Sequence, residues 1–215
     1  MTSASESTPG TEDRSQVRHR EVAEAARRVI ARSGLDNTRL RDIAEEAGFT
    51  TGVLTHHFPD KRSVIFATFA AAYGQWLEEA QRTFAAASDG PELLGALLAR
   101  AVPSTQSEQR DYRLWIEMLA YACSDQEFAV EVMHVDTLTW ERELAMALTR
   151  LQKAGLLHEN LDVVAEARIM NRLIDGLCIR AWLNDGWADA RRHFVIHLAA
   201  LGVPDPVART LLSGP

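Results

Sequence analysis

The chain has little cysteine and no hydrophobic run long enough to cross a membrane. Its two cysteines, Cys123 and Cys178, stand alone and lack the C-x-x-C spacing, which argues against a disulfide framework and against a zinc knuckle. Two buried thiols are expected instead. A membrane span needs about 20 consecutive apolar residues, and no segment of the sequence approaches that length. No membrane partner is therefore expected.

Motifs of secretion and of catalysis are also missing. Residues 1–13 have neither the basic start nor the apolar segment of a signal peptide. They are rich in Ser, Thr, Gly and Pro, which predicts a disordered tail on a cytoplasmic protein. The sequence contains no glycine-rich phosphate loop, no G-x-S-x-G elbow and no H-E-x-x-H motif. We therefore expect no catalytic residue, no cofactor and no metal.

Charge is distributed unevenly along the chain. The net charge is −7 over the 215 residues, which taken alone argues against a nucleic-acid partner. Residues 14–66, however, carry ten lysines and arginines against seven aspartates and glutamates, whereas residues 67–215 carry thirteen against twenty. This asymmetry favours a polyanionic partner for the N-terminal part only, although a solvated helix face is an alternative explanation.

Apolar residues recur at helical spacing along the rest of the chain, and no alternating strand pattern is found. An all-α fold is therefore predicted. The expected helices run from about Val17 to Gly34, 39–47, 50–57, 61–86, 92–102, 107–123, 126–154, 162–185, 187–201 and 204–213. Thr38 and Asp60 are expected to cap the second and fourth of them. The domains predicted are a tail at 1–13, a helix-turn-helix domain at 14–62 and a helical domain at 63–215.

The segment 38–61 has the layout of a helix-turn-helix. A short helix, a turn at Gly48-Phe49 and a second short helix follow one another, and the second helix of such a unit enters the major groove of DNA. Hydroxyls and imidazoles on that second helix suit phosphates and base edges, while threonine and valine methyls suit the thymine methyl. The alternative is an ordinary helical hairpin with a polar surface.

Residues 17–66 resemble the DNA-binding domain of the TetR family of regulators. The resemblance is carried by Ser33-Gly34, Thr38-x-x-Arg41-Asp42-Ile43-Ala44, Ala47-Gly48-Phe49 and Gly52-Val53-Leu54-x-His56-His57-Phe58-x-x-Lys61. The family pattern has Tyr where this chain has Thr55. The His-His-Phe variant, with Leu173-Ile174-Asp175-Gly176-Leu177 and Trp182, is similar to the branch that contains the choline-responsive BetI regulators.

The resemblance implies a set of operator contacts on double-stranded DNA. Thr38, His57 and Lys61 would touch the phosphate backbone. Bases would face Arg41, Thr50, Thr51, Val53 and His56. The full predicted DNA-binding set is Thr38, Arg39, Arg41, Thr50, Thr51, Gly52, Val53, Thr55, His56, His57 and Lys61.

The resemblance also implies that residues 67–215 bind an effector and form a homodimer. The wide apolar faces of 162–185 and 187–201 fit a two-fold four-helix interface, or alternatively packing within one monomer. Central aromatic and soft side chains could line a pocket for an apolar ring or a quaternary ammonium, or could be plain core. The predicted ligand-binding set is Trp76, Tyr112, Trp115, Met118, Tyr121, Met133, His134 and Trp140.

Three functional hypotheses follow. The first is a regulator, typically a repressor, that a small molecule releases from its operator. The second is a helical enzyme or ligand scavenger without sequence-specific DNA affinity. Its most specific version is a di-iron protein, which needs two Glu-x-x-His motifs. The sequence has one, Glu131-x-x-His134, and no second copy. The third keeps the DNA binding and drops the effector.

Overall fold

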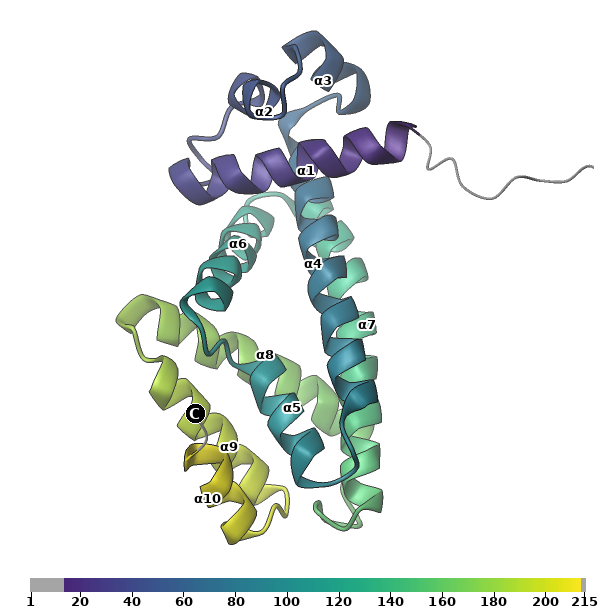
Figure 1. Cartoon of the computed structure of the whole chain (residues 1–215), viewed down its shortest axis with the longest axis vertical. Helices are drawn as coiled ribbons and strands as arrows, with labels where there is room; N and C mark the ends of the chain where they lie inside the picture. The colour runs from purple at the N-terminus through teal and green to yellow at the C-terminus, as the bar shows by residue number, and fades with distance from the viewer. Residues whose placement is uncertain (1–13, 214–215) are drawn as a thin grey trace, which may run out of the picture. The chain divides into compact units, whose positions relative to one another are not determined.

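The computed structural model describes residues 14–213, with side chains for residues 17–132 and 139–213. Within that range the chain forms helices and short connections and contains no strand (Figure 1), so the predicted all-α class is confirmed. The chain divides into two compact units, which meet between Ala71 and Ala72 inside one long helix. The sequence placed a boundary at 62/63; the start of that helix instead packs into the first unit through Val64 and Ala67.

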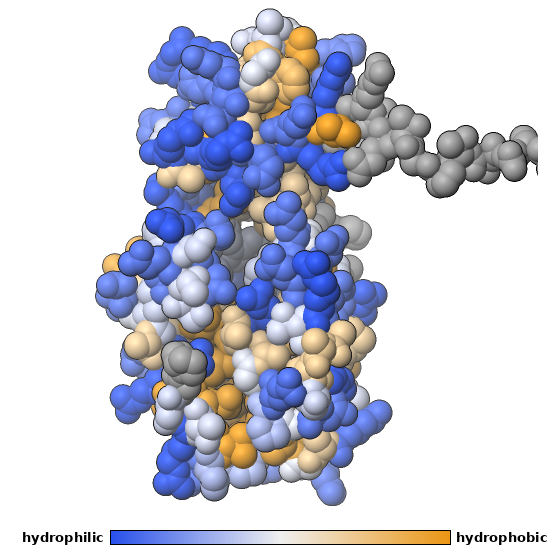
Figure 2. Space-filling view, viewed as in Figure 1, coloured by the Kyte–Doolittle hydropathy of each residue, from blue (hydrophilic) through white to orange (hydrophobic). Residues whose placement is uncertain are grey.

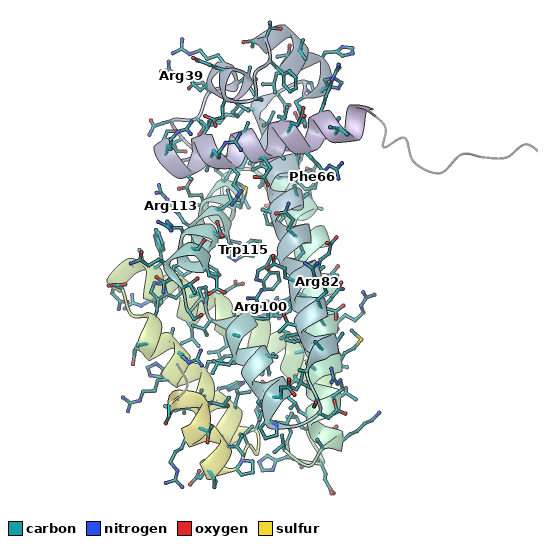
Figure 3. All side chains as sticks on the ribbon, in the orientation of Figure 1. Arg39, Phe66, Arg82, Arg100, Arg113 and Trp115 are labelled. Carbon is teal, nitrogen blue, oxygen red and sulfur yellow. The ribbon has the colours of Figure 1, made fainter. Side chains whose placement is uncertain are left out.

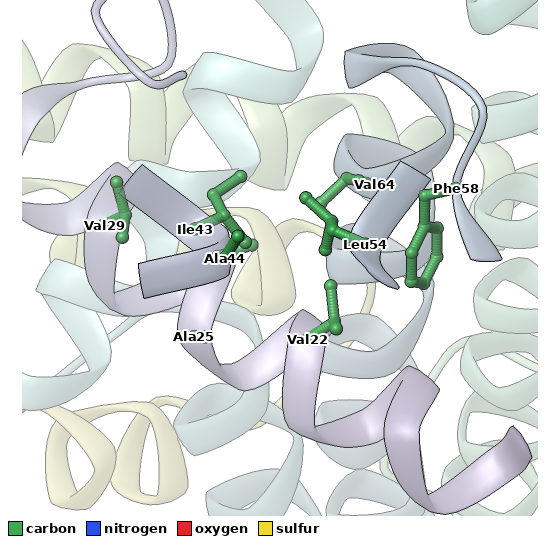
Figure 4. Packing of buried hydrophobic residues seen from close by; sticks show 9 residues of the cluster. Val22, Ala25, Val29, Ile43, Ala44, Leu54, Phe58 and Val64 are labelled. Atoms are coloured by element: carbon green, nitrogen blue, oxygen red, sulfur yellow. The ribbon is translucent and has the colours of Figure 1, made fainter. Parts of the chain in front are cut away.

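The first unit is built from three helices and the start of a fourth. They are α1 (Arg14–Ser33), α2 (Leu40–Glu46), α3 (Thr51–His57) and α4 (Lys61–Ala86). Their apolar faces close over one small core (Figure 4), whose members are Val22, Ala25, Ala26, Val29, Ile43, Ala44, Leu54, Phe58 and Val64. Small alanines on α1 and α2 allow the helix axes to approach closely, so short helices are held rigidly by few side chains.

The second unit contains the remainder of α4 and six further helices. They are α5 (Pro91–Ala101), α6 (Gln106–Ala122), α7 (Gln126–Lys153), α8 (Val163–Asn184), α9 (Trp187–Ala200) and α10 (Asp205–Ser213). α7 packs on α8, α8 on α9, and α9 on α10, while α5 lies against α7, α9 and α10. None of the helices in the described range is long and apolar enough to cross a membrane.

An arginine fixes the end of α4 to α7. Arg150 donates to the carbonyl oxygens of Phe84 at 2.6 Å and Ala87 at 2.7 Å, and its Nε lies 2.6 Å from Oδ1 of Asp89. The last carbonyls of a helix have no intrahelical partner. The guanidinium therefore satisfies the C-terminal end of α4 from a neighbouring helix.

Two local predictions need correction, and one is confirmed. Asp60 does cap α4, because its Oδ1 accepts from the amide of Ser63 at 2.7 Å. Thr38 does not cap α2, since Arg39 occupies the N-cap and the Thr38 hydroxyl donates to the carbonyl of Gly34 at 2.8 Å. Cys178 is buried as expected, but Cys123 is exposed because it follows the last turn of α6.

Candidate DNA-binding site and regulatory cluster

The turn between α2 and α3 is set by Gly48. Its φ of 74° is left-handed backbone that favours glycine, and it lets the amide of Phe49 return to the carbonyl of Ala44 at 2.8 Å. Thr50 then begins α3 as its N-cap, with Oγ1 accepting from the amide of Val53 at 3.3 Å. This turn and cap fix where α3 starts and which way it faces.

α3 buries one side chain and presents most of the others to solvent. Leu54 is 1% exposed and anchors the helix in the core. Its opposite surface carries the side chains predicted to face DNA, and His57 is half-buried at its end. The exposed members are Thr50, Thr51, Gly52, Val53, Thr55 and His56. Side chains over α1 to α3 are mostly hydrophilic, with a few apolar ones between them (Figure 2).

Arginines border this surface, and two acidic residues of α2, Asp42 and Glu46, are paired. Arg39 is exposed (Figure 3), and Arg41 is exposed beside Asp42, with Nε and Oδ1 3.2 Å apart. Glu46 accepts from Arg28 and Arg32 at 2.6 Å each. The hydrogen bond from Arg32, and after it the bond from Arg28, lowers the pKa of Glu46. This carboxylate therefore stays ionised and holds α2 on α1.

Two residues predicted to contact the DNA backbone are engaged within the protein. Thr38 is buried, so its hydroxyl is not available to a phosphate in this conformation. The ammonium of Lys61 donates to the carbonyls of Leu35 at 2.8 Å and Asp36 at 3.4 Å. These partners of Lys61 are neutral carbonyl oxygens and not carboxylates.

The second unit contains a half-buried carboxylate among aromatic side chains. Oδ1 of Asp175 on α8 accepts from Nε1 of Trp115 at 3.0 Å and from the Tyr112 hydroxyl at 3.3 Å, both on α6. The Tyr112 ring also meets Trp187 of α9 edge-on, with ring centroids 6.1 Å apart. Cys178 lies one turn along α8, and its thiol donates to the carbonyl of Ala101 at 3.5 Å. We call Tyr112, Trp115, Asp175 and Trp187 the Asp175 cluster.

Burial dominates the acid–base chemistry of this cluster. It raises the pKa of Asp175, although the bonds from Trp115 and Tyr112 and the charge of Arg172 oppose the shift. Burial also raises the pKa of Tyr112, and it raises the pKa of Cys178 to about 12. The tyrosine and the thiol are therefore neutral at physiological pH, so Asp175 is the group of the cluster that can carry a negative charge.

The predicted ligand-binding residues do not all meet at this cluster. Tyr112 and Trp115 belong to it; Figure 3 labels Trp115. Trp76 and Trp140 form a separate aromatic contact between α4 and α7, with ring centroids 4.6 Å apart. Tyr121 packs edge-on against Phe128 at 4.9 Å, and Met118 is fully buried. The side chains of Met133 and His134 lie outside the described residues.

Sequence reasoning missed Asp175 as a ligand-site candidate. The buried positions of α8 include Met170, Asn171, Ile174 and Cys178, and Asp175 lies beside them in the helical register. A lone carboxylate next to an apolar helix face was the available signal.

α8 and α9 also leave apolar side chains in solvent. Val164, Ile169 and Leu183 on α8 and Ile196 on α9 are each more than half exposed. Beside them, Arg168 and Arg172 are ion-paired to Glu141 of α7, at 3.6 Å and 3.2 Å. An apolar surface with neutralised charges is of the kind that protein interfaces cover.

Comparison with known proteins places the chain in one family, through matches to most of its length. Residues 22–68 match the bacterial regulatory proteins of the tetR family, and residues 90–202, more than half of the chain, match the C-terminal domain of BetI-type transcriptional repressors. The HTH-type transcriptional regulator BetI of Burkholderia thailandensis is 29% identical over 183 residues, 82% of this chain and 87% of that protein. The HTH-type transcriptional regulator PksA of Bacillus subtilis is 28% identical over 169 residues, 78% of this chain and 80% of that protein.

Solved structures show the same fold. A TetR-family transcriptional regulator from Rhodococcus has a TM-score of 0.73 at 23% identity, over 87% of this chain and 99% of that one. A transcriptional regulator from Saccharomonospora viridis, solved in complex with choline, has a TM-score of 0.74 at 23% identity, over 86% and 96%. The chain therefore belongs to the TetR family of DNA-binding transcriptional regulators, with a C-terminal domain of the BetI type, and it is a regulator rather than an enzyme.

Proposed function

We propose that this regulator is a cytoplasmic repressor, which binds its operator as a homodimer and is released by a small organic cation. Regulators of its family bind operator DNA and dimerise. The observation that carries the effector class is the Asp175 cluster, where a half-buried carboxylate accepts from Trp115 and Tyr112, and Tyr112 contacts Trp187. A carboxylate beside aromatic rings suits a quaternary ammonium, which gains both ionic and cation–π attraction. The related structure with choline bound supports the same class.

The operator half of the proposal depends on α3. Its exposed residues supply hydroxyls, methyls and imidazoles, of which Thr51, Val53 and His56 are proposed to read bases. Arg39, Arg41 and Lys61 are proposed to act on phosphates or on a guanine edge. Because a symmetric dimer presents two such helices, the half-sites should lie about 34–36 Å apart or at a multiple of that distance.

The dimer is proposed to form through α8 and α9. Their solvent-facing apolar residues, Val164, Ile169, Leu183 and Ile196, would be covered by the same surface of a second copy. A cation that favours one arrangement of this unit shifts the spacing of the two α3 helices only through a difference in affinity between the two arrangements. A coupling of about 1–3 kcal/mol is enough to relieve repression.

The experiment is a fluorescence anisotropy titration of DNA from the region upstream of the protein's own gene, with nonspecific competitor, in the presence and absence of choline. We expect two chains per site and a loss of affinity with choline. The uncharged isostere 3,3-dimethylbutan-1-ol should have no such effect. Equal release by the two compounds would exclude a cation effector, and equal affinity for scrambled DNA would exclude an operator there.

A further inference from the structure

Three histidines from two helices gather at the end of α3. The ring centroids of His56 and His57 are 5.3 Å apart, and those of His57 and His19, on α1, are 5.6 Å apart. His19 also lies against the core residue Phe58, with centroids 4.7 Å apart. His56 is exposed, and His19 and His57 are half-buried. We call His19, His56 and His57 the histidine cluster.

The charges that shift the pKa of His57 are positive. Desolvation lowers the pKa of His57, and the charges of His56, His19 and Arg18 lower it further, with no carboxylate opposing them. On α1, His19 shares its face with Val22 and Ala23, which are both buried. His57 therefore resists protonation while the protein is free.

Three acidic groups on the neighbouring elements, Asp42, Glu46 and Asp60, are engaged elsewhere. On α2, Glu46 pairs with Arg28 and Arg32, and Asp42 pairs with Arg41. At the start of α4, Asp60 accepts from the Ser63 amide, and Lys61 donates to the carbonyl of Leu35. None of these bonds supplies a negative charge to the imidazoles.

We propose that His57, with His19 beside it, forms a proton-linked contact to the DNA backbone, so that operator affinity falls as the pH rises through the neutral range. The proposal rests on the proposed role of α3 in operator binding. It adds His19, which lies on α1 outside the helix-turn-helix segment, to the residues that contact a phosphate. The ligand is the phosphodiester common to all duplexes, so the effect extends to nonspecific DNA.

The direction of the pH effect on DNA affinity follows from proton linkage. A phosphate beside His57 favours its imidazolium form, whereas the free protein disfavours that form, so DNA binding takes up a proton between the pKa of the free state and that of the bound state. Below that window His57 is protonated in both states, and affinity no longer changes with pH. Each proton taken up changes affinity by about tenfold per pH unit within the window.

A metal ion is the alternative ligand for neighbouring imidazoles. The described side chains contain no group of three or more His, Cys, Asp or Glu placed to hold one. Chelator in the binding buffer separates the two explanations, because proton uptake does not depend on it.

The experiment measures the affinity of the full-length protein for its upstream duplex between about pH 6 and 8 at fixed ionic strength, with chelator present. We expect the wild type to lose about tenfold over this range, and His19→Gln and His57→Gln to lose less than about threefold. His19→Arg should hold the wild type's low-pH affinity at the high end, because its charge does not titrate. His193→Gln, on the exposed surface of α9, is the matched control and should retain the full pH dependence.

The outcomes separate this inference from the proposed function. Tight and specific operator binding that is independent of pH, or a pH dependence that His19→Gln and His57→Gln both leave unchanged, overturns the histidine cluster alone. Failure of the wild type to prefer its upstream duplex at any pH overturns the operator proposal as well. Thermal melting of each variant checks that the contact between His19 and Phe58 has not been lost with the fold.

Discussion

Nε1 of Trp115, on α6, donates a hydrogen bond of 3.0 Å to Oδ1 of Asp175, on α8. The bond joins residues that are 60 positions apart in sequence and fixes a half-buried carboxylate beside an indole N–H. Since Tyr112 donates to the same oxygen, the carboxylate is held by two donors. We propose that this arrangement gives the second unit its preference for positively charged ligands.

Removing the charge of Asp175 should weaken effector binding. Asp175→Asn keeps an oxygen that can accept from Trp115 but loses the negative charge, so choline affinity should fall by about tenfold or more. Titration calorimetry with choline measures this, and operator affinity without choline should remain unchanged. Asp189→Asn, on the exposed surface of α9, is the control. If Asp175→Asn binds choline as the wild type does, the effector site lies elsewhere.

Effector affinity should depend on pH in the direction opposite to operator affinity. Because burial raises the pKa of Asp175, the folded protein keeps this carboxyl protonated to higher pH than the unfolded chain does. A cation binds the carboxylate form, so choline affinity should rise as the pH rises through the raised pKa. The contribution of Asp175 to folding stability is present below its ordinary pKa and is lost over the same rise. Choline titrations across this range should show no pH dependence for Asp175→Asn.

Lys61 should contribute a nonspecific, salt-dependent part of DNA affinity. Its ammonium is charged and held by the carbonyls of Leu35 and Asp36 in the free protein. Lys61→Met keeps the aliphatic stem, and it should weaken binding to all duplexes alike and lower the salt slope by about one per half-site. Lys153→Met, at the exposed end of α7, should leave the slope unchanged. An unaltered slope in Lys61→Met would mean that this lysine serves only the loop before α2.

Arg150 should stabilise the second unit through the end of α4. Arg150→Met leaves the carbonyls of Phe84 and Ala87 without their donor, which should cost about 1–3 kcal/mol of unfolding free energy. Asp89→Asn should cost less, because Asp89 is more than half exposed. Chemical denaturation of the two variants gives the comparison. Equal losses would indicate that the ion pair, and not the carbonyl contacts, carries the stabilisation.

Much of the fold could be predicted from local patterns. The helical period and the breaks at Gly34, Gly48 and Pro103 located nearly every helix to within a residue or two of its bounds. α1 is the exception, because it begins at Arg14, three residues before the first apolar position at Val17. A polar first turn continues the backbone hydrogen bonds without adding to the apolar pattern, so periodicity alone does not detect it.

The regulatory cluster could be predicted only in part. Tyr112 and Trp115 were identified as aromatics on one helix, but their partner Asp175 comes 60 or more residues later. Which of the central aromatics meet is decided by tertiary packing, and Trp76 and Trp140 meet each other instead. The role of Thr38 was likewise not predictable from local pattern, since its hydroxyl donates to the carbonyl of Gly34 after α1 and does not cap α2.

The central claim is that α3 reads operator sequence. Its most direct test is the ratio of affinities for the upstream duplex and for a scrambled duplex, measured for the wild type and for Thr51→Ala combined with Val53→Ala. Both side chains are exposed and outside the core, so the fold should persist, as it should in the control Thr210→Ala on α10. We predict that the ratio falls by about tenfold or more while affinity for scrambled DNA is kept. A double variant that discriminates as well as the wild type would contradict the account.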